Sequence, residues 1–255
     1  GTLYGANAYA GVINIVTKKN KENRFFVQST LSVEEPSIQI GGTAVITPDT
    51  LFLDYAGTFA HFSGDMDDRT TGDNNINTSD NGFGRATLRY APTGGDFDAS
   101  ITYSREWLRS HEEVYAFQRD VDDRIYDSRL YGELPLLKRK VTNISGQLNY
   151  RVGDVTLSSI SAYQESDVMR NFSSGAGSRY FWPQNDKLFT QELRLAYESD
   201  ILSGVAGLWY SHDDFTGTKN GYSGYYGDAR NNVINDSLAA FGEVTWHVND
   251  RFDLT

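Results

Sequence analysis

The chain has 255 residues, a formal net charge of -11, no cysteine and a mean hydropathy of -0.49. This composition argues against a nucleic-acid partner, because no basic face is available to neutralise phosphates, and it excludes disulfides and thiolate metal sites. No stretch approaches the roughly 20 consecutive apolar residues of a membrane-spanning helix, but a membrane β-barrel hides its apolar signal in alternation and carries aromatic girdles, which the 13% aromatic content fits.

The first 19 residues differ from everything that follows. They are small, apolar and punctuated by Gly5 and Gly11, which allow a close approach between backbones. Residues 12–16 then form a short, mostly apolar strand candidate that would be buried on both faces. The polar run 17–21 marks an exit into water, so this segment reads as the end of a compact, buried element.

From Arg24 onward, apolar and polar residues alternate with the two-residue period of β-strands, and no helical period of useful length is visible. The pattern predicts ten strands and an eleventh that begins at Arg251. The ten lie near residues 24–33, 37–46, 51–62, 82–91, 96–109, 140–152, 155–169, 187–198, 203–215 and 237–248.

The connections between these strands alternate in length. Short turns rich in Gly, Pro, Asp and Asn fall at 47–50, 92–95, 153–154, 198–200 and 249–250, and long connections fall near 63–81, 110–139, 170–186 and 216–236. The connection at 34–36 is the short exception on the long-loop side. Outer-membrane barrels place short turns on the periplasmic rim and long loops outside. The sequence therefore predicts an all-β protein, an antiparallel up-and-down transmembrane β-barrel, which a soluble sandwich would have no reason to imitate in this respect.

Several motifs resemble one family. The residues Leu3, Tyr4, Gly5, Ala8, Gly11, Val12, Ile13, Asn14 and Ile15, followed by Thr17 and Lys18, resemble the closing segment of the plug domain of TonB-dependent outer-membrane receptors. The segments 189–195, 204–210 and 240–246 resemble strands that recur in the same receptors.

The resemblance implies a domain division. Residues 1–21 would be the C-terminal end of a plug domain, with Lys18, Lys19 and Lys21 near the periplasmic rim, and residues 22–255 would be the N-terminal part of the barrel. Plugged transporters have roughly 22 strands, and an open sheet edge is not viable in lipid, so we expect a partial barrel that continues beyond Thr255. A closed barrel of about ten strands is the alternative, but it would be too narrow to hold a plug.

The resemblance also implies a function in the bacterial outer membrane: TonB-dependent uptake of a scarce ligand, with a ferric siderophore favoured. The expected partners are the siderophore, the TonB complex through plug residues outside this chain, and outer-membrane lipid and lipopolysaccharide. Receptors for cobalamin, haem or oligosaccharide remain alternatives, as do a passive porin and a soluble protein that binds glycans. The four histidines are far apart and no local catalytic motif appears, so we expect no enzyme activity and no cofactor.

Two of the long loops interleave aromatic and cationic side chains, which suit a bulky, anionic ferric chelate. The candidates are Tyr115, Phe117, Arg119, Arg124, Tyr126, Arg129, Tyr131, Arg170, Arg179, Tyr180 and Trp182. Such loops also contact lipopolysaccharide or pack on each other. The stretch 217–226 reads as a flexible loop that could fold over a ligand. The acidic residues of 65–73 resemble a calcium loop, but Arg69 occupies a ligand position, so no metal site is predicted.

Overall fold

A computed structural model gives the fold and describes residues 19–114, 116–173, 179–222, 229–249 and 252–255. All of the plug-motif residues, from Leu3 to Ile15, lie outside the described residues, as do Lys18 and Tyr115. The strands are β1 (Arg24–Thr30), β2 (Ser37–Thr47), β3 (Leu51–Phe62), β4 (Asp67–Asp68), β5 (Ser79–Tyr90), β6 (Phe97–Ser110), β7 (Ile125–Tyr126), β8 (Leu136–Val152), β9 (Val155–Phe172), β10 (Arg179–Glu198), β11 (Leu202–Tyr222), β12 (Ala229–Asn249) and β13 (Phe252–Leu254).

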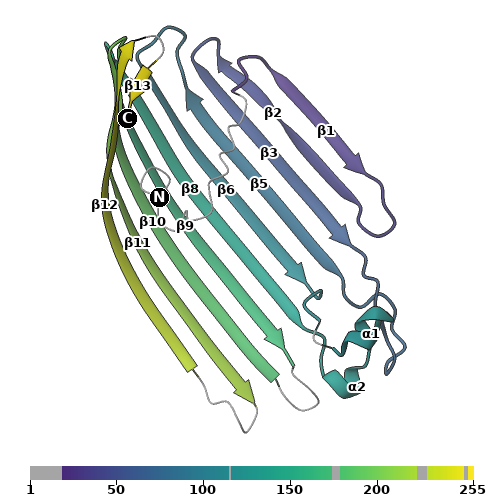
Figure 1. Cartoon of the computed structure of the whole chain (residues 1–255). Helices are drawn as coiled ribbons and strands as arrows, with labels where there is room; N and C mark the ends of the chain where they lie inside the picture. Colours follow the sequence, from purple (N-terminus) through teal and green to yellow (C-terminus); the bar gives the residue numbers. More distant parts are fainter. Residues whose placement is uncertain (1–18, 115, 174–178, 223–228, 250–251) are drawn as a thin grey trace.

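Eleven of these strands form one curved antiparallel sheet in which every strand pairs with its neighbours in sequence order (Figure 1). All eleven predicted strands are therefore confirmed. The short turns predicted at 47–50, 92–95, 153–154 and 198–200 are present, and Asp49, Gly94 and Gly153 adopt the positive φ angles that tight turns require. The turn predicted at 249–250 lies partly outside the described residues. Within the described residues β1 and β13 are the two edges, so the sheet is open, as expected for a partial barrel.

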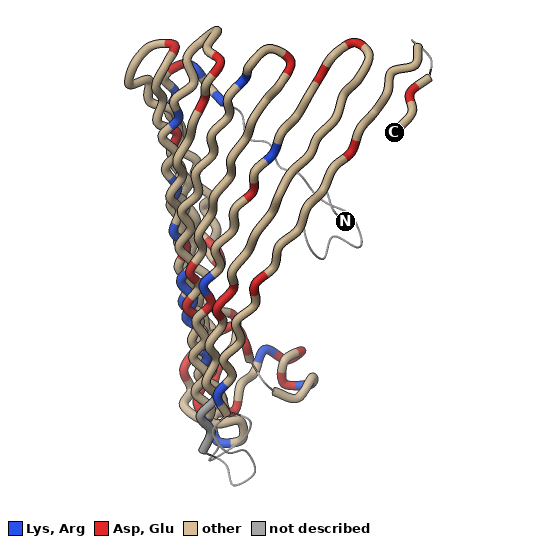
Figure 2. Tube along the Cα trace, turned by 90° about the vertical axis from the view of Figure 1, so that its left-hand side faces the viewer, with Lys and Arg blue, Asp and Glu red and all other residues tan. Residues whose placement is uncertain are grey.

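The two faces of the sheet differ in chemistry. In β6, Ile101, Tyr103 and Trp107 lie on one face and are exposed, whereas Thr102 and Ser104 lie on the other and are partly buried. The apolar, exposed face is the convex one. The polar face is concave and looks inward, and Figure 2 shows the sheet curving around that side. This is the alternation of a membrane barrel, which faces lipid outside and a polar lumen inside.

Two predicted loops are mostly strand. The expected loop 170–186 is largely taken up by β9 and β10, and much of 216–236 belongs to β11 and β12, so the stretch 217–222 is not a loop. Strand residues beyond the hydrocarbon layer need no apolar face, so their sequence does not alternate between apolar and polar residues. These strand ends are held by backbone pairing, and their polar sequence was therefore interpreted as loop. Consequently Arg170 lies in β9, and Arg179, Tyr180 and Trp182 lie in β10.

The other two long connections, 63–78 and 111–135, pack together at the long-loop end of the sheet. They contribute β4, β7 and two short helices, α1 (Gln118–Asp122) and α2 (Ser128–Tyr131), which sit on the concave side (Figures 1 and 2). We call these two connections the loop module. No helix in the described part of the chain is both long and apolar enough to cross a membrane.

Candidate functional site

The loop module has a small core of its own. Met66, Tyr126 and Tyr131 are buried together, and partly buried apolar residues of both connections pack against them: Ile76, Val114, Ala116 and Leu134. Tyr126 is only 1% exposed, and its hydroxyl donates to the carbonyl oxygens of Gly132 and Glu133, each at 3.2 Å. Burial raises the pKa of Tyr126 to about 12.

Backbone pairing joins the two connections although they are far apart in sequence. β4 and β7 are parallel, with Asp67 opposite Ile125 and Asp68 opposite Tyr126. The amide of Asp67 donates to the carbonyl of Arg124 at 3.0 Å, and the amide of Arg69 donates to that of Tyr126 at 2.8 Å. The two connections therefore behave as one folded unit rather than two independent loops.

Asp68 stabilises this junction through its carboxylate. Its Oδ1 accepts the amide of Thr70 at 2.9 Å and that of Ser128 at 3.2 Å, across the two connections. Burial raises the pKa of Asp68, but the hydrogen bonds from Ser128 and Thr70 outweigh that effect, so the net pKa is lowered. An ion pair between Arg124 and Asp65 at 2.7 Å closes the same junction from outside.

A second buried carboxylate holds α1 against α2. The Tyr131 hydroxyl donates to Asp120 Oδ2 at 2.5 Å, and Arg119 Nε donates to Asp120 Oδ1 at 3.1 Å. The hydrogen bond from Tyr131 is the main reason that the pKa of Asp120 is lowered. Burial, and then the bond to Asp120, raise the pKa of Tyr131.

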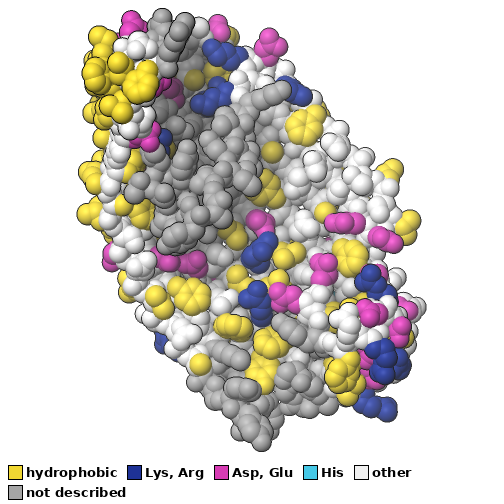
Figure 3. All heavy atoms as spheres, in the orientation of Figure 1, with side chains coloured by type: hydrophobic (Ala, Val, Ile, Leu, Met, Phe, Trp, Pro, Cys, Tyr) yellow, Lys and Arg dark blue, Asp and Glu magenta, His cyan; other side chains and the backbone are white. Residues whose placement is uncertain are grey.

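The structure divides the predicted ligand residues of this module into two groups. Tyr126 and Tyr131 form the core of the module, and Arg124 forms an ion pair at its junction. These three side chains stabilise the fold of the module. Phe117 is 65% exposed and the Arg119 side chain is 75% exposed, and Arg129 is also exposed. These three remain accessible on a rigid support. Figure 3 looks onto the concave face and shows basic and acidic side chains gathered over the module at its lower right.

The predicted residues of β9 and β10 attach the module to the barrel wall. Arg170 Nε contacts Glu113 Oε2 at 3.2 Å, and Arg179 forms an ion pair with Glu133. Tyr180 is buried and stacks on Phe172 with ring centroids 5.1 Å apart. Trp182 lies two residues further along the same face of β10 and is partly buried.

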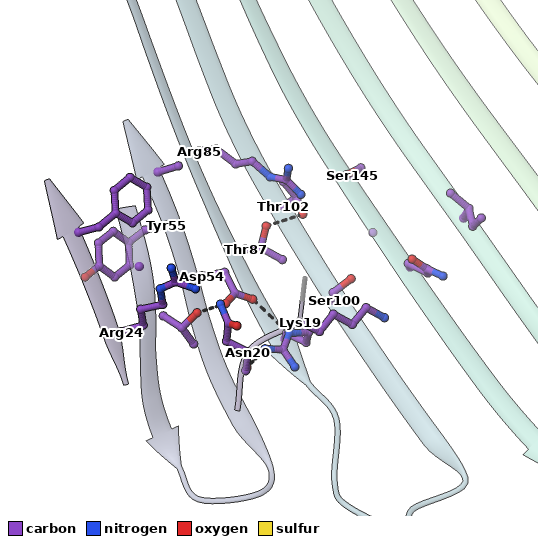
Figure 4. Close-up of a pocket in the computed structure, with 18 residues that line it drawn as sticks. Lys19, Asn20, Arg24, Asp54, Tyr55, Arg85, Thr87, Ser100, Thr102 and Ser145 are labelled. Carbon is purple, nitrogen blue, oxygen red and sulfur yellow. Dashed lines mark hydrogen bonds and ion pairs between the residues drawn. The ribbon is translucent and has the colours of Figure 1, made fainter. Parts of the chain in front are cut away.

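A second candidate site lies on the concave face near the short-turn end. It is a hollow of about 540 Å³ on the inner faces of β1 to β9, and we call it the inner-wall pocket (Figure 4). Cationic side chains dominate its charged lining: Lys19, Arg24, Arg85 and Arg89, with Asp54 as the acid.

Arg89 and Asp54 organise this pocket. Arg89 Nε donates to Asp54 Oδ2 at 3.1 Å, and the guanidinium lies 4.5 Å above the ring of the fully buried Phe52. Thr43 Oγ1 donates to the other oxygen of Asp54 at 2.6 Å. Within the described residues Arg24 and Arg85 form no ion pair, so their charges face the hollow.

The pocket also holds the start of the described chain. Arg89 Nη2 donates to the carbonyl of Asn20 at 2.6 Å, and the amide of Val45 donates to Asn23 Oδ1 at 2.8 Å. Lys21 Nζ donates to Thr93 Oγ1 at 3.0 Å, in the turn between β5 and β6. Lys21 therefore lies at the short-turn rim, as predicted.

Sequence reasoning did not single out this pocket. Its signal was present as the polar half of the strand alternation, because Arg85 and Arg89 occur on the inner face of β5 among small and hydroxyl side chains. Only the curvature of the sheet brings them together with Arg24 on β1 and Lys19 before it.

The comparisons with known proteins agree with this architecture. The chain matches no protein-family profile. It is 26% identical to the pesticin receptors of Yersinia enterocolitica and Yersinia pestis over 260 aligned residues, which cover all of this chain and 38% of those receptors. The chain thus spans well under half the length of these relatives.

Solved structures give the same result. The ferric yersiniabactin uptake receptor FyuA from Yersinia pestis matches 99% of the chain with a TM-score of 0.87 and 25% identity, over 41% of its own length. The siderophore receptor PiuA from Acinetobacter baumannii matches 90% of the chain and 41% of its own length, with a TM-score of 0.67, and at 10% identity this match shows the fold alone.

These relatives are receptors and uptake proteins rather than enzymes. The strand series, the alternation of its faces and the similarity along the whole chain point the same way. The chain therefore shares the fold of TonB-dependent receptors of the bacterial outer membrane and is similar to them along its whole length.

Proposed function

We propose that the protein takes up a ferric siderophore across the outer membrane in a TonB-dependent manner. The observation that carries the proposal is the similarity along the entire chain to a receptor described as taking up ferric yersiniabactin. In this proposal residues 1–21 are the end of the plug and residues 22–255 are the first part of the barrel wall. The protein moves its ligand without making or breaking covalent bonds.

Capture would begin at the loop module. Its buried core supports Arg119, which lies on α1, and Phe117, which immediately precedes α1. Both would lie at the outer mouth of the barrel. A guanidinium pairs with the anionic oxygens of a ferric chelate, and an aromatic face stacks on its rings. Because the module is folded before the ligand arrives, little ordering entropy opposes binding. Arg129 and Trp182 complete the proposed contact set.

The inner-wall pocket would act later in uptake. Arg24, Arg85 and Lys19 place positive charge on the inner wall, which attracts an anionic chelate once a path opens. The Arg89 bond to Asn20 would fix the chain between plug and barrel, so that force applied to the plug does not detach it from the wall. Outer-membrane lipid and lipopolysaccharide would cover the convex face.

The proposal is tested by ligand binding to the intact receptor in detergent. Quenching of tryptophan fluorescence would be titrated with a panel of ferric siderophores, the iron-free chelators, cobalamin, haem and an oligosaccharide. We expect saturable binding of one ferric chelate and weaker binding by the Arg119→Gln variant, with the neighbouring Gln118→Ala as the matched control. Saturable binding of cobalamin, haem or the oligosaccharide instead would reassign the ligand class and contradict the siderophore proposal.

A further inference from the structure

The convex face carries a band of exposed apolar residues that ends in aromatic rings toward the long-loop rim. Phe59 and Trp107 lie 6.0 Å apart between centroids, and Phe189 and Tyr210 lie 6.4 Å apart. Outer-membrane barrels have an apolar band about 25 Å tall with aromatic girdles at both interfaces. We call the side chains Phe59, Trp107, Tyr163, Phe189 and Tyr210 the outer girdle. They mark the level at which the outer leaflet's hydrocarbon ends.

Four cations lie around this girdle on two neighbouring strands: Arg105 is one step on its membrane side, and the other three are at or beyond it. Arg105 and Arg109 flank Trp107 on β6, and Lys138 and Lys140 lie on β8, with Arg109 opposite Lys138 and Trp107 opposite Lys140. All four are exposed and share the convex face. β6 runs toward the long-loop rim and β8 runs away from it, so Arg109, Lys138 and Lys140 lie outside the hydrocarbon band. We call these four residues the cationic patch.

The cationic patch carries four positive charges against the two carboxylates that lie directly opposite it, Asp80 and Asp167. Within the described residues none of its four side chains forms an ion pair or a side-chain hydrogen bond. The flanking acids have other partners: Asp80, opposite Arg109, contacts His61 Nδ1 at 2.7 Å, and Asp167, opposite Lys140, accepts from Asn185 Nδ2 at 2.7 Å. Four cations therefore gather on one face of a chain whose net charge is -11.

A groove adjoins the patch on the neighbouring strands β8 to β11. Its volume is about 450 Å³, and it combines the cations Lys138 and Lys140 with the apolar surfaces of Met169, Phe181 and Pro183; Asp167 is the one acid on the same face of its described lining. Phe181 lies on the same outer face of β10 and is exposed. Positive charge beside apolar surface, placed immediately outside a hydrocarbon band, matches an amphiphile whose anionic head lies at the membrane surface.

We propose that the cationic patch binds the phosphorylated diglucosamine head of lipid A, the glycolipid anchor of lipopolysaccharide in the outer leaflet. Each guanidinium presents paired donors to phosphate oxygens and each ammonium binds phosphate as a point charge. The groove takes the sugar rings, and the acyl chains run along the apolar band below Trp107. This site rests on the outer-membrane placement of the proposed function but not on the identity of the transported ligand.

The test measures binding of purified hexa-acyl lipid A to the intact receptor by native mass spectrometry in detergent. The variant Arg105→Gln/Arg109→Gln/Lys138→Gln/Lys140→Gln is expected to bind at least about tenfold more weakly. The milder Lys138→Gln/Lys140→Gln variant should show an intermediate loss. The matched control is Lys187→Gln/Arg230→Gln, which removes two cations elsewhere on the convex face. Heat-dependent gel mobility confirms that each barrel is folded.

Three ligand arms separate the sources of a phosphate signal. Monophosphoryl lipid A should bind more weakly than the bisphosphorylated form, and neither inorganic phosphate nor phosphatidylglycerol vesicles should replace it. Equal binding by the quadruple variant, an equal loss in the control, or equal binding of phosphatidylglycerol would each overturn the assignment. Uptake of the ferric ligand is measured in the same variants, so a failed lipid site and a failed transport proposal give different results.

Discussion

Replacing Tyr131 by Phe removes one hydroxyl from the loop module and leaves its ring contacts with Phe117 and Tyr126 in place. The hydroxyl donates to Asp120 at 2.5 Å and accepts the amide of Phe117 at 3.2 Å. Without it, the buried carboxylate keeps, among the described residues, only the side-chain contact with Arg119, whose own side chain is mostly in water. Losing a hydrogen bond to a buried charged group costs about 1.5–3 kcal/mol.

This loss of stability predicts faster local opening of the loop module. A loss of about 2 kcal/mol increases the opening equilibrium of the module roughly 30-fold, because about 1.4 kcal/mol corresponds to a factor of ten. Hydrogen exchange followed by mass spectrometry on the intact receptor would show faster exchange in peptides from 63–78 and 116–135. Peptides from β9 and β10 should be unchanged below the module.

The control for this prediction is Tyr103→Phe, which removes a hydroxyl from the convex face, where within the described residues it has no hydrogen-bond partner. This variant should leave exchange in the module unchanged. The reasoning would be refuted if Tyr131→Phe changed module exchange less than threefold, or if it accelerated exchange equally throughout the barrel strands.

Three further predictions concern acidic, phenolic and inner-wall groups. Because the folded-state pKa values of Asp68 and Asp120 are lowered, their stabilisation of the module is present above about pH 4 and is lost as the pH falls through those lowered values. Exchange protection of the module, corrected for the intrinsic exchange rate at each pH, that does not fall as the pH is lowered from 6 through those values would contradict this. Tyr126 should remain protonated up to about pH 12 in an ultraviolet titration, and its ionisation with the exposed tyrosines near pH 10 would exclude the buried environment. Arg89→Met should lower the free energy of unfolding by about 1–3 kcal/mol in urea, because it leaves a half-buried carboxylate without its basic partner. Adding Asp54→Asn should recover part of that loss, and no recovery would show that the two residues are not coupled.

The barrel strands were predictable because their cause is local. Alternation in β3 or β6 records directly which side chains meet lipid and which face the lumen. The outer ends of β9, β10, β11 and β12 were not predicted, because they extend beyond the hydrocarbon layer and their sequences no longer alternate between apolar and polar residues. There the backbone ladder alone continues the strand, and polar sequence reads as loop.

The candidate site was only partly predictable, since its contacts are not local. The segment 110–139 was singled out as a ligand candidate, which stays a prediction, and nothing in the sequence reveals that β4 pairs with β7, because the pairing depends on two loops meeting in space. The same aromatic and cationic composition that suits a ligand also builds the core of the module. Tyr126 and Tyr131 are therefore structural, whereas Phe117 and Arg119, their close neighbours in sequence, remain exposed.

The central claim is tested most directly by uptake of radioactive iron in iron-limited cells. Uptake would be followed with the intact gene present or deleted, and with TonB present or absent, for each member of a panel of ferric siderophores. The account predicts that uptake of one chelate is lost when either the gene or TonB is removed, while uptake of the others continues in cells that lack only this gene. Uptake that is unchanged across the whole panel after deletion of the gene would contradict it.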